Sequence, residues 1–220
     1  MRTARAVFFT FVLLLSFTAA SAAEDKLEKI GRFTDNSASA SLHAALEPAG
    51  YKFILGTGKE LGEIWLAKSV TLGPKKNVEG ASYPELAVSE FIGVISFPDG
   101  AKDFRGNPVK PGSYTLRYGL MPDDGNHLGA APSRDFLLVS PIASDADPST
   151  SFTAGQLIAL SKKSMSVNHP GVFMLLPAQG GGSPRAYQNA DSFDIFSAEL
   201  KGNGGQELPF ELVLKGTAQQ

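Results

Sequence analysis

The chain has 220 residues, no cysteine, and 20 basic against 22 acidic residues, for a net charge of −2. The absence of cysteine excludes disulfides, thiolate metal sites and the lipid anchor of bacterial lipoproteins. No run of Lys or Arg exceeds two residues. A concentrated basic face for nucleic acid or an anionic membrane is therefore missing, and no nucleic-acid partner is expected.

The first residues follow the three-part pattern of a secretory signal peptide. Two arginines precede an uncharged apolar run, Ala6–Ala20, and small residues follow at the positions that a signal peptidase reads. The run is shorter than the roughly 20 residues that a membrane-spanning helix needs. We expect residues 1–22 to be a signal peptide, with cleavage after Ala22 or Ala23.

Residues 23–220 are expected to form a single domain in the periplasm or outside the cell. The leader contains two arginines and no acidic residue, so its removal leaves 18 basic and 22 acidic residues and a net charge of −4. No other segment approaches spanning length, and no membrane span is expected after cleavage. A domain of this size buries roughly 70% of its unfolded surface, which is enough for stability without disulfides.

Short stretches with two-residue alternation, or rich in Phe, Val, Ile and Tyr, predict strands between Gly- and Pro-containing turns. The predicted strands are Tyr51–Leu55, Glu63–Thr71, Phe91–Phe97, Tyr114–Leu120, Phe136–Ser140, Val172–Leu176, Phe193–Leu200 and Leu208–Leu214. In the last strand, Leu212 is expected to face the core and Glu211 the solvent. Residues 73–85, 123–134 and 179–191 are expected to be irregular.

One helix is predicted at Thr153–Ser164, where Thr153 and Gln156 have the spacing of a capping box. The Ala-rich stretch Ser37–Leu46 fits a helix or a strand. No alternation of strands and helices is present, which argues against a parallel nucleotide-binding sheet. The expected fold is mostly all-β: a two-layer antiparallel β-sandwich of about eight strands with one short helix.

Two short segments resemble a phosphate loop and a calcium loop, but each lacks residues that the site requires. Residues 56–59, Gly-Thr-Gly-Lys, are followed by Glu60 and a predicted strand, whereas a phosphate loop requires a hydroxyl residue and a helix. Residues 145–149 open like a calcium loop but lack the glycine and the glutamate that an EF-hand needs. A looser calcium site shared with Asp123 and Asp124 stays open.

The polar loops offer the candidate binding residues: Asp123, Asp124, Asn126, His127, Arg134, Asp135 and His169. Two loop histidines, His127 and His169, together with Asp135 have the chemistry of an open zinc or copper site. The alternative is that both histidines hydrogen-bond loop backbone. Arg117 is expected to form a cross-strand ion pair with Asp135.

The phrase Lys110–Tyr118, KPGSYTLRY, resembles the entry to a strand in transthyretin-like and carboxypeptidase-regulatory-like modules. More of the chain resembles a group of exported bacterial proteins of unknown function with a β-sandwich-like domain. The segments that prompt this second resemblance are EIWL at 63–66, DFRG at 103–106, KPGSYTLRY, DGNH at 124–127, RDFLL at 134–138 and NHP at 168–170. The resemblance implies a sandwich-like fold and assigns no catalytic residues.

No catalytic motif stands out, whereas several long polar loops join the predicted strands, which is where binding residues commonly lie. We therefore expect a non-catalytic exported protein that binds a protein or small-molecule ligand through its loops. One alternative is a zinc- or copper-binding protein that uses His127 and His169. The other is a hydrolase of cell-envelope or carbohydrate material.

Overall fold

A computed structural model describes residues 24–75, 77–122, 132–180 and 184–217. In these residues, ten strands form one antiparallel sheet in the order β1-β2-β3-β4-β7-β8-β9-β12-β11-β10. The strands are β1 (Lys26–Ile30), β2 (Gly50–Ile54), β3 (Glu60–Leu66), β4 (Phe91–Phe97), β7 (Gly112–Leu120), β8 (Asp135–Pro141), β9 (Val172–Leu176), β10 (Arg185–Gln188), β11 (Asp194–Lys201) and β12 (Glu207–Lys215). A separate short hairpin joins β5 (Ala101–Lys102) to β6 (Pro108–Val109).

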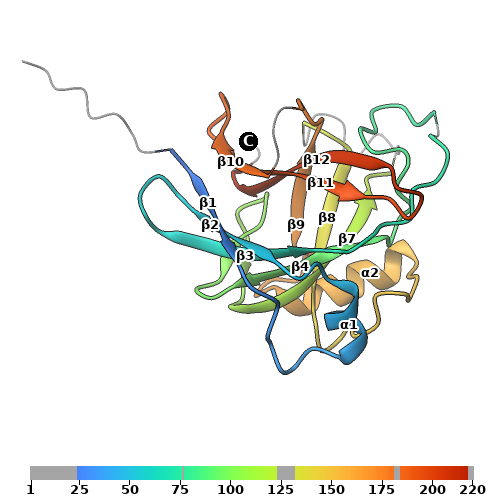
Figure 1. Cartoon of the computed structure of the whole chain (residues 1–220), viewed down its shortest axis with the longest axis horizontal. Coiled ribbons are helices and arrows are strands. Elements are labelled where there is room, and N and C mark those ends of the chain that lie inside the picture. The colour runs from blue at the N-terminus through green and yellow to red at the C-terminus, as the bar shows by residue number, and fades with distance from the viewer. Residues whose placement is uncertain (1–23, 76, 123–131, 181–183, 218–220) are drawn as a thin grey trace, which may run out of the picture.

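The sheet curls until its two edge strands, β1 and β10, lie against each other (Figure 1). Every neighbouring pair within it is antiparallel. Among the described residues, no backbone ladder joins β1 to β10. The result is a nearly closed, barrel-like sheet with one joint that backbone hydrogen bonds do not close. We call this joint the seam.

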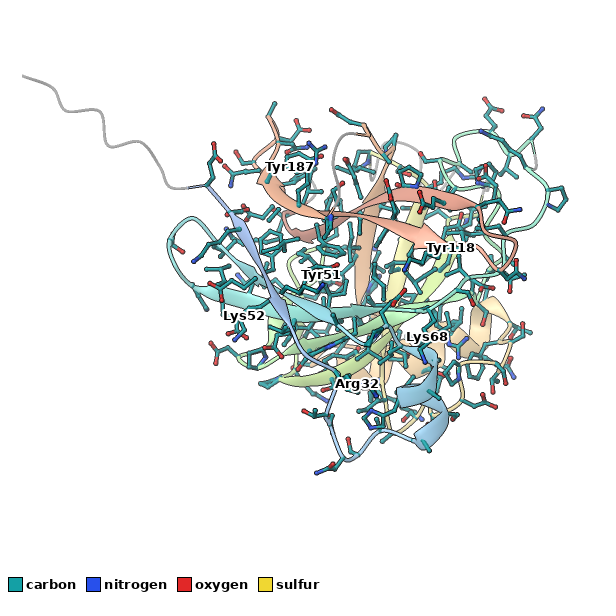
Figure 2. The ribbon with its side chains drawn as sticks, viewed as in Figure 1. Arg32, Tyr51, Lys52, Lys68, Tyr118 and Tyr187 are labelled. Carbon is teal, nitrogen blue, oxygen red and sulfur yellow. The ribbon has the colours of Figure 1, made fainter. Side chains whose placement is uncertain are left out.

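The expected two-layer sandwich of eight strands is wrong, although the chain is mostly β as expected. One curled sheet encloses the core, which apolar side chains from opposite walls fill. The rings of Phe97 on β4 and Phe173 on β9 stack with centroids 5.4 Å apart. The ring of Tyr51 on β2, which Figure 2 labels, has its centroid 5.9 Å from that of Phe196 on β11 across the interior. Each strand of a sandwich or a barrel alternates in the same way, so the pattern could not separate the two.

Two α-helices pack outside the sheet, where one was expected. Helix α1 (Ala40–Ala45) settles the ambiguous Ala-rich stretch as helix, with Ser39 accepting the Leu42 N–H at its N-terminus. Helix α2 (Ala154–Ser161) has the predicted capping box of Thr153 and Gln156 and lies against β8. A 3₁₀ turn, Lys162–Ser164, continues it. Among the described residues, no helix has the length and apolar character needed to cross a membrane.

Arg117 occupies the outer face of β7 and is fully buried. The expected pair with Asp135 is wrong, because Arg117 stands opposite Leu138 in the β7–β8 register. Its guanidinium instead binds both oxygens of the Asp145 carboxylate, with Nε–Oδ2 2.7 Å and Nη2–Oδ1 2.8 Å. This pair fastens the segment that leads into α2 onto the sheet.

Glu211 was expected on the solvent face of β12 but is 1% exposed. Its carboxylate accepts a 2.8 Å hydrogen bond from the Tyr187 hydroxyl and lies 3.4 Å from Nη2 of Arg185. Part of the outer face is thus buried, because β10 and its neighbouring segments cover it. The expectation that Leu212 faces the core is confirmed, with no measurable exposure.

Candidate functional site

Four of the seven predicted binding residues lie outside the described residues: Asp123, Asp124, Asn126 and His127. The loop cluster that they were expected to form therefore stays a prediction, as does the looser calcium site. The structure places the other three, Arg134, Asp135 and His169, and they do not form one group.

Asp135 begins β8 and is fully buried. Its carboxylate accepts hydrogen bonds from the backbone N–H groups of Ser82 (2.7 Å) and Tyr83 (3.1 Å), and from the hydroxyls of Tyr118 (2.6 Å) and Ser133 (3.0 Å). Burial raises the pKa of Tyr118, and its hydrogen bond to Asp135 raises it further. Asp135 thus ties the segment before β4 across one end of the barrel-like sheet.

Arg134 likewise binds backbone. Its Nε and Nη2 atoms donate to the carbonyl oxygen of Met121 at 3.0 and 2.7 Å, and Nη1 donates to that of Glu79 at 2.6 Å. These bonds join the start of β8 to the residue that follows β7 and to the 73–89 segment. The hydrogen bonds of Arg134 and Asp135 thus hold the 73–89 segment in place.

His169 lies before β9 with both ring nitrogens engaged. A carbonyl oxygen only accepts, so Nδ1 donates to the oxygen of Pro170 at 2.8 Å. The Arg105 guanidinium only donates, so Nε2 of His169 accepts from its Nη1 at 3.0 Å. The Nε2 lone pair of His169, which would bind a metal ion, is therefore directed at the Arg105 guanidinium.

Asp135 and His169 lie at opposite ends of β8. The register pairs Leu138 with Val172, and the Gly171 carbonyl accepts the Val139 N–H at 3.2 Å. His169 is two residues before Gly171, toward the end of β8 that Asp135 does not occupy. No contact joins these two side chains in the described residues, and the zinc or copper site of His127, His169 and Asp135 stays a prediction. No group of three or more metal-ligating side chains occurs in the described residues.

The described histidines also lack the partners of a hydrolytic triad. Nε2 of His43 is bonded to the backbone oxygen of Asp35 at 3.1 Å, and His169 is bonded as given above. Within the part of the chain that the structure describes, neither is hydrogen-bonded to a serine hydroxyl or a carboxylate. A histidine that activates a nucleophile is hydrogen-bonded to that nucleophile and is oriented by a carboxylate. The hydrogen bonds of these two rings are of neither kind.

A pocket of about 660 Å³ lies at the end of the barrel-like sheet where β3 begins and β4 and β12 end. We call it the mouth pocket. Apolar side chains from four segments line it: Leu61, Ala101, Val109, Phe193 and Leu214. No single sequence segment supplies more than a few of these residues, which explains why no local motif indicated the pocket.

Charged side chains also line the mouth pocket: Lys59, Lys102, Lys215, Asp99 and Asp191. The Lys215 ammonium binds Asp194 at 2.8 Å, and Asp191 accepts a 3.4 Å contact from the Asn189 amide. In the described ranges, the ammonium groups of Lys59 and Lys102 have no hydrogen-bond or ion-pair partner. Two cations next to an apolar surface thus remain available to a ligand.

A second pocket, about 530 Å³, opens at the seam and is lined from both sides, by Asp25 before β1 and by Tyr187 and Gln188 on β10. We call it the seam pocket. At its base, Asp194 is 1% exposed, and its carboxylate accepts from the Gln188 amide at 2.9 Å and from Lys215 at 2.8 Å. Figure 2 marks Tyr187 on this strand.

Asp25 is the other carboxylate of the seam pocket. Its Oδ1 accepts the Gly56 N–H at 2.8 Å, whereas its Oδ2 is buried and has no hydrogen-bond partner among the described residues. Burial raises the pKa of Asp25, and the neighbouring Asp194 carboxylate raises it further, against the opposing effect of the Gly56 N–H. The pair thus concentrates negative charge where the sheet is not closed.

A third pocket, about 450 Å³, lies between residues 31–35 and the outer face of β3, β4 and β7. Trp65 lines this pocket and is buried, with Nε1 donating to the Gly31 carbonyl at 2.9 Å. Asp35 accepts from the hydroxyls of Ser37 and Ser113, both at 2.7 Å. The Asp35 carboxylate and the Trp65 indole N–H in this third pocket are thus already bonded within the protein.

In comparisons with known proteins, no family model, no curated protein and no solved structure matched the chain significantly. The resemblance to exported sandwich-like proteins therefore stays a prediction.

Proposed function

We propose that the chain is an exported, non-catalytic binding protein whose mouth pocket takes a small amphipathic ligand. The observation that carries the proposal is the combination of an apolar pocket surface with the unpartnered ammonium groups of Lys59 and Lys102. The volume of about 660 Å³ is within the roughly 300–1,000 Å³ of pockets for small ligands. The mouths of barrels are also places where such pockets commonly occur.

The ligand has an apolar body and an anionic end. Leu61, Ala101 and Phe193 offer surface to the apolar body. Lysine ammonium groups pair best with carboxylate or phosphate oxygens, so the anionic end lies toward Lys59 and Lys102. Asp99 and Asp191 share the rim, and their charge limits affinity for a multiply charged anion.

Binding of octanoate, octanol and octyltrimethylammonium, measured by calorimetry and thermal shift, tests this proposal. Octanoate is expected to bind at least tenfold more tightly than the ammonium compound. The variant Ala101→Trp fills the pocket and should weaken octanoate binding by at least tenfold, while Ile158→Trp on the exposed face of α2 is the matched control. If none of the three compounds binds at millimolar concentration, the mouth pocket is not such a site.

Export is the second part of the proposal. It is supported by the leader pattern of two arginines, the apolar run Ala6–Ala20 and the small residues at the cleavage point. Expression of the full chain in a bacterium, followed by cell fractionation and intact mass measurement, tests it. The expected product begins at Ala23 or Glu24 and is found outside the cytoplasm. A cytoplasmic product of full mass would contradict export.

A further inference from the structure

We propose that Asn203 is a site of spontaneous covalent modification, at which the folded protein slowly converts asparagine to aspartate and isoaspartate. The Gly204 nitrogen attacks Cγ of Asn203, a C–N bond forms, and the Cγ–Nδ2 bond breaks with loss of ammonia. Water then opens the resulting succinimide at either carbonyl carbon. The net change consumes one water, releases one ammonia and involves no oxidation or reduction. The inference is independent of export and of the ligand proposed for the mouth pocket.

The first support is the position of Asn203 in the molecule. It lies in the turn that joins β11 to β12 (Figure 1), and Asn203, Gly204 and Gly205 are all exposed to water. Of the seven asparagines in the chain, Asn203 is the one that glycine follows. Because glycine has no Cβ, nothing on Gly204 hinders the approach of its nitrogen to the Asn203 side chain.

The second support is that the two reacting groups are not held by other contacts. In the part of the chain that the structure describes, neither the Gly204 N–H nor the Asn203 carboxamide has a hydrogen-bond partner. Rotation about the Cα–C bond of Asn203 brings the Gly204 nitrogen to Cγ. Glycines at 202, 204 and 205 accommodate this rotation, since glycine is the residue with the widest range of backbone conformations.

Two other asparagines show how the fold or the next residue prevents the same reaction. The Asn189 side chain is held in place, because its Oδ1 accepts the N–H groups of Asp191 and Phe193, both at 3.0 Å. Asn107 is followed by Pro108, whose ring nitrogen has no hydrogen to lose and cannot form the imide. These two asparagines therefore serve as internal controls for Asn203.

The isoaspartate product changes the turn more than the aspartate product does. Its main chain runs through the former side chain, which adds one carbon between Asn203 and Gly204. Two hydrogen bonds close the turn around this point: the Gly205 N–H donates to the Gly202 carbonyl at 3.0 Å, and the Gly202 N–H donates to the Gln206 carbonyl at 2.7 Å. A longer main chain no longer fits these bonds, so isoaspartate opens the end of the β11–β12 hairpin, whereas aspartate leaves the backbone unchanged.

Incubation of the folded protein at pH 8 and 37 °C, followed by tryptic digestion and mass spectrometry, tests the inference. Residues 202–215 form one tryptic peptide, in which Asn203 is the sole asparagine. This peptide should separate into aspartate and isoaspartate forms, while the peptides that contain Asn107 and Asn189 stay unchanged. Gly204→Ala should slow the conversion by about tenfold, because its methyl group hinders the attacking nitrogen. That methyl meets the exposed carboxamide of Gln206, which can move aside.

The same incubation in guanidinium chloride gives the conversion rate of the unfolded chain. The folded protein should convert at a rate within about tenfold of it, and a folded rate about a hundredfold lower, which is a barrier about 2.7 kcal/mol higher, overturns the inference. Equal rates for the parent and Gly204→Ala, or equal conversion at Asn107 or Asn189, would also overturn it.

The effect of the extra carbon is measured against Asn203→Asp, a variant that carries the new charge on an unchanged backbone. Amide hydrogen exchange at Gly202 should be faster in the purified isoaspartate fraction than in Asn203→Asp, because the bond to the Gln206 carbonyl is lost. Equal exchange at Gly202 in the two proteins would contradict the opening of the turn.

Discussion

Substitution of Asp145 by Asn removes one charge from the buried ion pair beneath α2 and leaves Arg117 charged. Both side chains of the pair are 0% exposed, so water cannot replace the lost carboxylate. Loss of one partner of a buried pair typically costs about 3–5 kcal/mol. Arg117 keeps bonds to the carbonyl oxygens of Ser89, Thr150 and Asp147 at 2.8, 2.8 and 3.0 Å. We therefore expect the lower end, about 3 kcal/mol.

Urea unfolding of Asp145→Asn, Arg117→Met and the double variant Arg117→Met/Asp145→Asn measures this cost. Each single variant should lose about 3 kcal/mol of unfolding free energy, whereas the double variant should lose less than the sum by about 2 kcal/mol, because no unpaired charge remains. The aromatic rings of Phe152 and Phe91, 4.9 and 5.7 Å from Cζ of Arg117, can pack against methionine.

The matched control for the buried pair is the exposed pair of Lys26 and Glu28, whose side chains are 60% and 51% exposed. Glu28→Gln should change the unfolding free energy by less than about 1 kcal/mol, since surface ion pairs contribute little. A loss below 1 kcal/mol for Asp145→Asn, or strictly additive losses in the double variant, would refute the assignment of Arg117 and Asp145 as a desolvated, coupled pair.

Three further outcomes are expected. Leu212→Asp should abolish folding or cost more than about 4 kcal/mol, because it buries an unpaired charge in the core; circular dichroism of the purified variant checks this. Glu211→Ala should cost about 1–3 kcal/mol in urea unfolding by leaving buried donors unpaired; a silent substitution would show that β12 is exposed there. The Ser37 and Ser113 hydroxyls hold the pKa of Asp35 below its ordinary 3.8. Asp35 therefore adds stability above that pH, and this is lost as the pH falls through the lowered pKa. Asp35→Asn should flatten that part of the stability–pH curve.

The strands that could be predicted from sequence are those with a buried face. Phe91–Phe97 and Val172–Leu176 have the predicted bounds, and Tyr114–Leu120 lies within the longer β7. The two strands at the edges of the sheet, β1 and β10, were missed. Their sequences, KLEKI and RAYQ, are short and mostly polar, since an edge strand beside an open joint buries little of either face. Alternation gives no signal in such segments.

Closure of the sheet and the location of the pockets could not be predicted for a different reason. Period-two burial specifies which side of a strand faces the core and says nothing about whether two sheets or one curled sheet surrounds it. The mouth pocket brings together Lys59, Lys102 and Phe193, which are distant in sequence, so only the three-dimensional arrangement indicates it. Glu211 and Arg117 were misplaced because polar residues on an alternating strand normally indicate the solvent side.

The position of β12 between β9 and β11 determines when the molecule can assemble. Strands β1 to β9 of the main sheet are neighbours in the order in which they are synthesised. In the described residues, backbone ladders join β10 and β11 to the other strands only through β12, which follows them in the chain. A polypeptide that emerges from a ribosome therefore cannot enclose its interior until residues 207–215 are free. Until then the apolar wall of β8 and β9 stays uncovered, so an incomplete chain exposes apolar surface that the finished sheet buries.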